Sequence, residues 1–336
     1  MSTPAGGWRI VAPGKLILMG EYAVIDGAAG VVMAVDRYAT VERKSLGLGN
    51  TPRDDLVSFA RSETAARLGC SFSPGAFRAD SSSLWQDGLK LGLGSSAAVA
   101  VCAVASTFHE VGKDVGLAST RRRMWGMARE IHERFQDSRG SGLDVAAALF
   151  GGVTHMRTGN TGSPPDFLPW TPPAGLRLIK VWSGKPASSP DLVGRVSRFG
   201  LQNPVEYGRV IDRMAETAER FAAEGPDSLH VVLESFNQYA ALMDELGRRS
   251  GACIVTEQMA EVLAQARKAG GAAKPSGAGG GDFIVAAFPV NGAWEKFSQE
   301  AKAMGMVPMD LPVALEGVHV EADEMARGKG NDRQGN

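Results

Sequence analysis

The chain has 336 residues, of which 44% are hydrophobic and 22% are charged, and its formal net charge is -1 at pH 7. This length and composition indicate a globular protein with two domains, or with one large core and a smaller partner. A net charge so close to zero produces no field that would gather polyanions, so we expect neither nucleic acid nor an anionic membrane as a partner.

The cysteines and the apolar segments bear on the cellular compartment. Cys70, Cys102 and Cys253 are odd in number, far apart and without metal-ligand spacing, which is typical of buried thiols in a reducing compartment. The first residues contain no signal-peptide core, and no apolar run is long enough to cross a bilayer. We therefore expect a cytoplasmic protein.

The beginning of the chain is predicted to be rich in strands. The proline and glycine of Ala12-Pro13-Gly14-Lys15 are expected to separate two short strands, and a valine-rich alternating segment predicts a longer one. These three strands are predicted over residues 8–12, 16–19 and 31–41. Helical spacing follows over residues 51–69, and a segment rich in Ser, Gly and Asp over 71–88 predicts loops and short strands.

The most informative stretch is Lys90-Leu91-Gly92-Leu93-Gly94-Ser95-Ser96-Ala97-Ala98, which runs into a predicted buried helix over residues 95–111. The glycines permit close backbone approach, and the first N–H groups of a helix lack partners within it, so the stretch is suited to holding a phosphate. The alternative is an ordinary capped helix after a flexible turn. A P-loop is not indicated, because the Lys-Ser or Lys-Thr ending is missing.

A second glycine turn lies in the middle of the chain. An amphipathic helix is predicted over residues 120–136. It is followed by Gly140-Ser141-Gly142-Leu143-Asp144 and a small-residue helix over 145–150, which Gly151 and Gly152 end. Five prolines over residues 159–175 predict a surface connector, and a strand is expected over 176–182.

The remainder of the chain is mostly helical and ends with a third glycine run. Helices are predicted over residues 191–199, 205–223, 228–246 and 257–269. The run Lys274-Pro275-Ser276-Gly277-Ala278-Gly279-Gly280-Gly281-Asp282 precedes a core strand over residues 283–288. We predict a boundary near Pro190, which gives an N-terminal domain over 1–189, a C-terminal domain over 190–326 and a disordered tail over 327–336.

Together, these segments resemble the three ordered motifs of the GHMP small-molecule kinase superfamily, which includes galactokinase, homoserine kinase, mevalonate kinase and phosphomevalonate kinase. Pro13-Gly14-Lys15 with Gly20-Glu21-Tyr22 resembles the first motif, the Gly94-Ser95-Ser96 loop the second, and Ser276 to Asp282 the third. The resemblance spans nearly the whole chain.

Within the superfamily, the chain is most similar to the phosphomevalonate kinase branch. Its second motif, its Lys-Pro-Ser-Gly-Ala-Gly-Gly-Gly-Asp run and the loop Trp182-Ser183-Gly184-Lys185-Pro186 are of that type, and Val145 stands where mevalonate kinases keep an asparagine. One feature points to mevalonate kinases: Glu133-Arg134 falls where they carry a magnesium-binding glutamate.

The resemblance implies an α+β fold, in which an N-terminal domain like the second domain of ribosomal protein S5 joins a ferredoxin-like C-terminal domain, with the active site in the cleft between them. It implies an ATP- and Mg²⁺-dependent kinase that acts on phosphomevalonate as a monomer or homodimer. Mevalonate kinase is the first alternative, and a catalytically silent nucleotide-binding member is the second.

The resemblance also assigns roles to individual residues. Lys15 and Asp144 are the expected catalytic residues: the lysine stabilises charge on the transferring group, and the aspartate orients or deprotonates the acceptor. Ser96 is the preferred magnesium ligand. The nucleotide would be held by Lys90, Gly92, Leu93, Gly94, Ser95, Ser96 and Ala97. The substrate would contact Lys15, Glu21, Tyr22, Ser141, Lys185, Ser276, Gly277, Ala278 and Gly279.

Several of these residues have an equally ordinary structural use. Tyr22 either binds substrate or packs, and Ser141 either contacts substrate or caps the following helix. Lys185 either contacts the phosphate or carboxylate of the substrate or is a solvated lysine. Glu133 either completes the magnesium site or lies on the surface of a charged helix. His132, on the same helix, has no partner that the sequence suggests.

Overall fold

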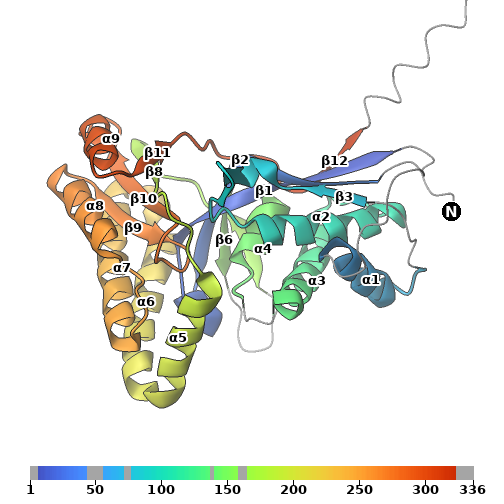
Figure 1. The fold of residues 1–336 in the computed structure, drawn as a ribbon, viewed down its shortest axis with the longest axis horizontal. Helices are drawn as coiled ribbons and strands as arrows, with labels where there is room; N and C mark the ends of the chain where they lie inside the picture. The colour runs from blue at the N-terminus through green and yellow to red at the C-terminus, as the bar shows by residue number, and fades with distance from the viewer. Residues whose placement is uncertain (1–6, 44–55, 72–76, 137–139, 158–164, 323–336) are drawn as a thin grey trace, which may run out of the picture.

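In the computed structural model of this protein, the described residues are 7–43, 56–71, 77–136, 140–157 and 165–322. They form two antiparallel sheets, each covered by its own helices, and a short two-stranded ribbon of β4 (Trp85–Gln86) and β5 (Leu89–Lys90). Figure 1 shows the two sheet-and-helix halves side by side.

The first half is built on a sheet with the strand order β12-β1-β2-β6-β7, in which β3 also pairs with β2. Its strands are β1 (Trp8–Met19), β2 (Gly30–Arg43), β3 (Phe77–Asp80), β6 (Val153–Arg157), β7 (Asp166–Pro169) and β12 (His319–Ala322). Its helices lie together on one face of the sheet (Figure 1): α1 (Leu56–Leu68), α2 (Ser95–Glu110), α3 (Ala118–Gln136) and α4 (Leu143–Phe150). The predicted strand over 31–41 and the predicted helices over 95–111 and 120–136 are confirmed.

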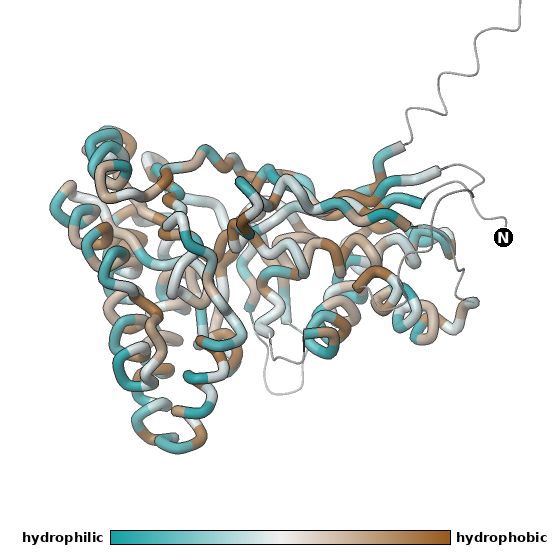
Figure 2. Tube along the Cα trace, viewed as in Figure 1, coloured by the Kyte–Doolittle hydropathy of each residue, from teal (hydrophilic) through white to brown (hydrophobic). Residues whose placement is uncertain are grey.

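The second half is built on a sheet with the strand order β11-β8-β10-β9. The strands are β8 (Leu176–Trp182), β9 (Ala272–Ser276), β10 (Phe283–Pro289) and β11 (Val307–Met309). The helices are α5 (Ser189–Gln202), α6 (Pro204–Glu224), α7 (Leu229–Ser250), α8 (Glu257–Lys268) and α9 (Trp294–Ala303). Figure 2 shows these helices alternating between hydrophilic and hydrophobic residues, which is the pattern of helices with one face on a core.

The chain crosses between the halves more than once. Strand β8 pairs with β10 and β11 of the second sheet, although it precedes Pro190. At the other end, β12 returns to pair with β1, and the segment before it bridges to β2 through Val313 and Val35. The predicted boundary near Pro190 stays a prediction, and the predicted tail over 327–336 lies outside the described residues.

The predicted break at Pro13 is wrong, because β1 continues through it as one strand. The register against β2 shifts between Pro13 and Gly14. Such a bulge accommodates a residue that has no N–H to donate, so the strand bends without ending. Gly14 is required there: a Cβ atom on it would lie 2.8 Å from the carbonyl oxygen of Leu93 in the second-motif loop.

Two further expectations are corrected. The predicted surface connector over 159–175 contains β7, which pairs with β6 at the edge of the first sheet, where a terminal proline is tolerated. Of the cysteines, Cys102 is buried as expected, whereas Cys70 is only partly buried and Cys253 is exposed. In the part of the chain that the structure describes, no helix is long and apolar enough to span a membrane.

Candidate active site

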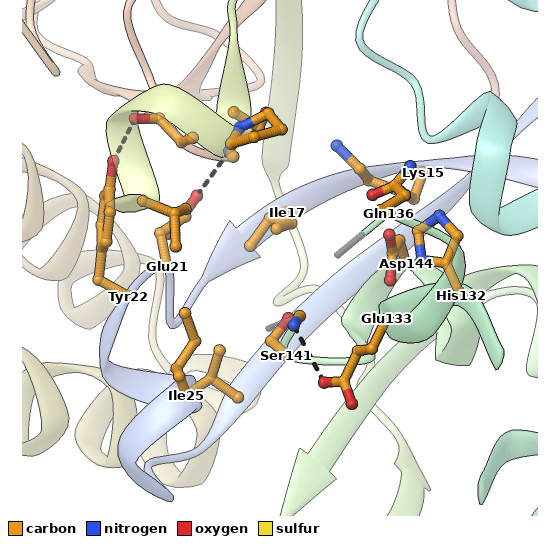
Figure 3. A pocket seen from close by; sticks show the side chains of 17 residues that line it. Lys15, Ile17, Glu21, Tyr22, Ile25, His132, Glu133, Gln136, Ser141 and Asp144 are labelled. Atoms are coloured by element: carbon orange, nitrogen blue, oxygen red, sulfur yellow. Dashed lines mark hydrogen bonds between the residues drawn. The ribbon is translucent and has the colours of Figure 1, made fainter. Parts of the chain in front are cut away.

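A pocket lies between the two halves, lined by residues from β1, α3, α4, α5 and the loop after β9. Figure 3 shows Lys15, Ser141 and Asp144 on one side of it and Glu21 and Tyr22 on the other. Parts of the first and third motifs and of the second glycine turn, which are far apart in the sequence, therefore meet at a single site.

Lys15 is held between the second and third motifs. Its Nζ donates to the carbonyl oxygen of Gly92 at 2.9 Å, and its backbone N–H donates to Leu93 at 2.9 Å. A Cβ atom on Gly277 would lie 3.7 Å from the same Nζ. The ammonium group therefore lies where the loops of the two halves approach each other.

The second-motif loop ends at Gly94, the N-cap of α2, with φ of 76° and no side-chain capping bond. A Cβ atom on Gly94 would lie 3.0 Å from Cγ of Lys15 and 3.6 Å from Cβ of Asp144, so this residue separates the two expected catalytic side chains. Ser96 Oγ accepts a hydrogen bond from Gln136 Nε2 at 3.0 Å, which connects the loop to a residue that lines the pocket.

Asp144 is placed by the turn that begins α4. Gly142 has φ of 76°, and its carbonyl accepts a hydrogen bond from Trp125 Nε1 at 3.0 Å. Asp144 follows in the first turn of the helix, partly exposed, with Oδ1 accepting from the N–H of Val145 at 2.9 Å. Ser141 Oγ accepts from the N–H of Leu143 at 3.2 Å, so this hydroxyl supports the turn and also lines the pocket.

The first motif is tied to the third by direct contacts. Tyr22, whose φ of 62° is strained for a bulky residue, donates from its hydroxyl to the carbonyl oxygen of Ala278 at 2.5 Å (Figure 3). Ser276 is buried, and its Oγ accepts from the N–H of Ile17 at 2.9 Å. Burial and the neighbouring Glu21 raise the pKa of Tyr22 well above its usual value, which keeps the hydroxyl a donor.

The aspartate that ends the third motif has a structural role. Asp282 Oδ1 accepts from the N–H of Ala187 at 3.0 Å, and a Cβ atom on Gly92 would lie 2.3 Å from Asp282 Oδ2. Burial raises the pKa of this carboxyl group, against the lowering effect of Lys15 and Lys90. Asp282 thus connects the loop of residues 183–187 to the second motif.

The predicted site residues divide into two groups. Those that line the pocket are Lys15, Glu21, Tyr22, Glu133, Ser141, Asp144, Gly277 and Ala278. Those that do not are Lys90, Gly92, Leu93, Gly94, Ser95, Ser96, Ala97, Lys185, Ser276 and Gly279. Lys185 is exposed, and the Nζ of Lys90 lies 5.6 Å from the ring centre of Trp85. Gly279 packs on Ile254, whose carbonyl oxygen would lie 2.3 Å from a Cβ atom there.

Sequence reasoning missed two pocket residues on α3, His132 and Gln136 (Figure 3). The Nε2 atom of His132 is buried and has no hydrogen-bond partner among the described residues. Helical spacing indicated only that His132 and Gln136, which are four positions apart, share one face of α3. That face also presents Glu133, whose Oε1 accepts from Arg129 at 3.1 Å and from the N–H of Gly140 at 3.0 Å.

The residues at this site fit a magnesium ion that is bound mainly through a nucleotide. Among the described residues, no group of three or more His, Cys, Asp or Glu could hold a metal on its own. Mg²⁺ usually keeps several waters and takes one or two protein oxygens beside phosphate oxygens. The Ser96 hydroxyl at the start of α2 and the carboxylates of Glu133 and Asp144 at the pocket are oxygen donors of the required kind.

Comparison with known proteins points to the same superfamily as the sequence motifs. The GHMP kinases N terminal domain family matches residues 86–152, and the GHMP kinases C terminal family matches residues 231–303. The chain is 28% identical to a phosphomevalonate kinase of Streptomyces sp. (strain CL190), over 91% of this chain and 97% of that protein. It is 27% identical to a mevalonate kinase of Thermococcus onnurineus, over 92% of this chain and 97% of that one.

The same fold is found among solved structures. Streptococcus pneumoniae phosphomevalonate kinase, in complex with phosphomevalonate and AMPPNP, superposes with a TM-score of 0.76 at 17% identity, covering 91% of this chain and 99% of that one. The fold and the two family matches, in order along the chain, agree with the meeting of the first motif, the third motif and the second glycine turn at the pocket. The chain therefore contains both the N-terminal and the C-terminal domain of the GHMP kinases, over residues 86–152 and 231–303.

Proposed function

We propose that this protein transfers the γ-phosphoryl group of ATP to (R)-5-phosphomevalonate, giving ADP and (R)-5-diphosphomevalonate. The observation that carries the proposal is the meeting of Lys15, Asp144 and the Gly277–Ala278 loop around one pocket. The phosphomevalonate kinase type of the motifs and the Streptomyces relative support this choice of acceptor. The ligands named for the Streptococcus structure, phosphomevalonate and AMPPNP, are of the same kinds.

On the nucleotide side, the second-motif loop and the start of α2 would hold the triphosphate. The N-cap of α2 is Gly94, which has no side chain to cap the first N–H groups of the helix and allows a phosphate to approach the backbone closely. Ser96, with Glu133 or Asp144, would hold Mg²⁺. When bound, the metal neutralises charge on the phosphates.

Lys15 would stabilise the charge of the group in transfer. Its Nζ lies between the Gly92 carbonyl and the Gly277 loop, so a phosphoryl group that passes from the second motif to the pocket would pass this ammonium. A fixed positive charge at that point favours the transition state over the ground state.

Asp144 would act mainly by orientation. A phosphate acceptor is already ionised at neutral pH, so no proton needs to be removed before attack. The partly exposed carboxylate at the start of α4 lies across Gly94 from Lys15. In this position it would align the acceptor oxygen or a metal ligand rather than serve as an obligatory base.

Mevalonate kinase is the second candidate. Glu133 lines the pocket at the position where mevalonate kinases carry a magnesium-binding glutamate, and the Thermococcus relative is a mevalonate kinase. With mevalonate, Asp144 would have to accept the proton of a neutral hydroxyl. A catalytically silent member is disfavoured, because Lys15, Ser96 and Asp144 are all present.

The test is an ADP-release assay with purified protein, ATP and Mg²⁺, run in parallel with phosphomevalonate and mevalonate. We expect turnover of phosphomevalonate, with kcat/KM for mevalonate lower by at least about 10²-fold. Turnover of mevalonate alone would replace the proposal with its alternative. Nucleotide binding without turnover of either acceptor would support a silent member.

A further inference from the structure

Lys274 on β9 is a buried charged side chain that the proposed chemistry does not use. Its side chain has no exposed surface, and it does not line the pocket. Removing an ammonium group from water is unfavourable unless a partner compensates for the lost hydration. The surroundings of Lys274 therefore indicate what it is for.

The partner is Glu21 of the first motif. Lys274 Nζ donates to Glu21 Oε1, and also to the carbonyl oxygen of Pro275 at 2.7 Å. The rings of Phe236 and Tyr239 on α7 lie 5.9 and 5.7 Å from the same Nζ. The lysine thus joins the second sheet and α7 to the end of β1.

Glu21 has a second donor, which lies in the third-motif loop. The same Oε1 atom accepts from the N–H of Gly277 at 3.3 Å, and Figure 3 shows this bond crossing from Glu21 to the loop. Tyr239 fixes the glutamate from the other side, since its hydroxyl donates to the Glu21 carbonyl oxygen at 2.7 Å. The carboxylate position is therefore determined by Lys274, and the carboxylate in turn determines the position of the Gly277 peptide.

Gly277 lies close to Lys15. A Cβ atom on it would lie 3.7 Å from Lys15 Nζ, and its φ of 87° is one that glycine adopts without strain. A shift of this peptide would change the distance between the third motif and the ammonium group that faces the transferring phosphoryl.

We propose that Glu21, held in place by Lys274, is a positioning residue: its side-chain oxygen fixes the Gly277 peptide beside Lys15, and so aligns the second half of the protein for phosphoryl transfer. The inference rests on the proposed function for its effect on catalysis, whereas the effect on Gly277 can be measured without it. Apolar residues of similar volume often replace a buried ion pair without loss of stability, so the ion pair is not required merely to fill this space.

The experiment compares two double variants in which both charges are removed. E21Q/K274M keeps a side-chain oxygen at position 21 that can accept from Gly277, whereas E21M/K274M has none. We measure Tm, kcat, KM for ATP and hydrogen exchange of the Gly277 amide in both. We expect similar Tm values, but faster Gly277 exchange and a kcat lower by about tenfold or more in E21M/K274M.

Equal exchange and equal kcat in two folded double variants would overturn the proposal, because the pair would then serve stability alone. A difference in exchange without turnover of any acceptor would support the positioning of Gly277 while rejecting the proposed function. If a double variant does not fold, Y239F replaces it, since it removes only one hydroxyl. Unchanged Gly277 exchange and kcat in Y239F would count against the proposal, and faster exchange with lower kcat would support it.

Discussion

Asp144 offers the most direct test at the scale of a single residue. For Asp144→Asn we expect kcat with phosphomevalonate to fall by about 10²-fold, the low end for a positioned acid or base, because the acceptor is already ionised. The Kd for ATP should change little, since Asp144 lines the pocket and is not part of the second-motif loop that we propose holds the nucleotide. Steady-state kinetics and ATP titration measure both quantities.

The matched control for this substitution is Asp191→Asn on α5. Asp191 is exposed and paired with Arg195, so neutralising it should leave kcat unchanged. An unchanged kcat in Asp144→Asn, with ATP still bound, would remove Asp144 from the reaction.

Lys274→Met should make stability depend on pH in a defined direction. Burial raises the pKa of the Glu21 carboxyl group, and Lys274 opposes this rise. Without the lysine the folded-state pKa rises further above the unfolded value, so the neutral carboxyl stabilises the fold at low pH and this contribution disappears as the pH increases. We expect a loss of about 3–5 kcal/mol in unfolding free energy at pH 8, and a smaller loss at about pH 5.

Urea unfolding at the two pH values measures this difference. Lys302→Met, on the exposed last turn of α9, is the control and should change the unfolding free energy little at either pH. A loss for Lys274→Met that is equal at both pH values, or larger at the lower one, would contradict the expected sign.

At the scale of an element, the loop before α2 determines how far apart Lys15 and Asp144 lie. In Gly94→Ala, the new Cβ lies 3.0 Å from Cγ of Lys15 and the backbone keeps a positive φ. We expect a loss of about 1–2 kcal/mol in stability from the left-handed conformation. We also expect a fall of about 10²-fold in kcat/KM, because the lysine is displaced.

Gly112→Ala separates these two effects. Gly112 has φ of 72°, and apart from its chain neighbours no described residue has an atom within 4 Å of the added Cβ, so this variant carries the same backbone strain away from the pocket. It should lose stability to a similar extent and keep its activity. Equal activity losses in the two variants would show that strain, and not displacement of Lys15, is responsible.

Elements whose pattern is local could be predicted from the sequence, and those that depend on distant partners could not. Helix α2 was predictable because its run of small apolar residues carries its own start signal at Gly94. Strand β7 was missed because a four-residue edge strand with a proline has no periodic pattern of its own. The break expected at Pro13 was wrong because a bulge against β2 supplies the conformation that the proline needs.

The same distinction applies to the site. The glycine loops could be recognised as motifs from the sequence, because loops that a ligand approaches closely are among the few structures that need so many glycines together. The pairing of Lys274 with Glu21 joins residues 253 positions apart, and it depends on a meeting of two sheets that composition cannot reveal. His132 was visible as part of a helix, but the sequence did not show that its side of α3 faces the pocket.

At the scale of the whole molecule, the two halves should unfold together. Strand β12 at the end of the chain pairs with β1, and β8 pairs with strands that follow it by about a hundred residues. Neither sheet is complete without chain from the other side of the predicted boundary. We therefore expect a single cooperative urea transition, with coincident curves from tryptophan fluorescence and far-UV circular dichroism.

The segment 1–189 on its own provides a second test of this prediction. The segment 1–189 alone lacks β12 and leaves the apolar residues of β8 without β10, so it should not give a stable folded domain. Two separated transitions in the full chain, or a cooperatively folded 1–189 segment, would show that the halves are independent.

The exposed thiol of Cys253 has a practical consequence. The backbone carbonyl oxygen of Cys253 would lie 3.2 Å from a Cβ atom on Gly280. The carbonyl oxygen of the next residue, Ile254, accepts a hydrogen bond from the N–H of Gly280 at 2.8 Å. Cys102 is buried, and burial raises the pKa of its thiol, which protects it from alkylation. After Cys70 is changed to serine, a maleimide fluorophore would attach at Cys253, so the native chain already contains an optical reporter site beside its last glycine loop.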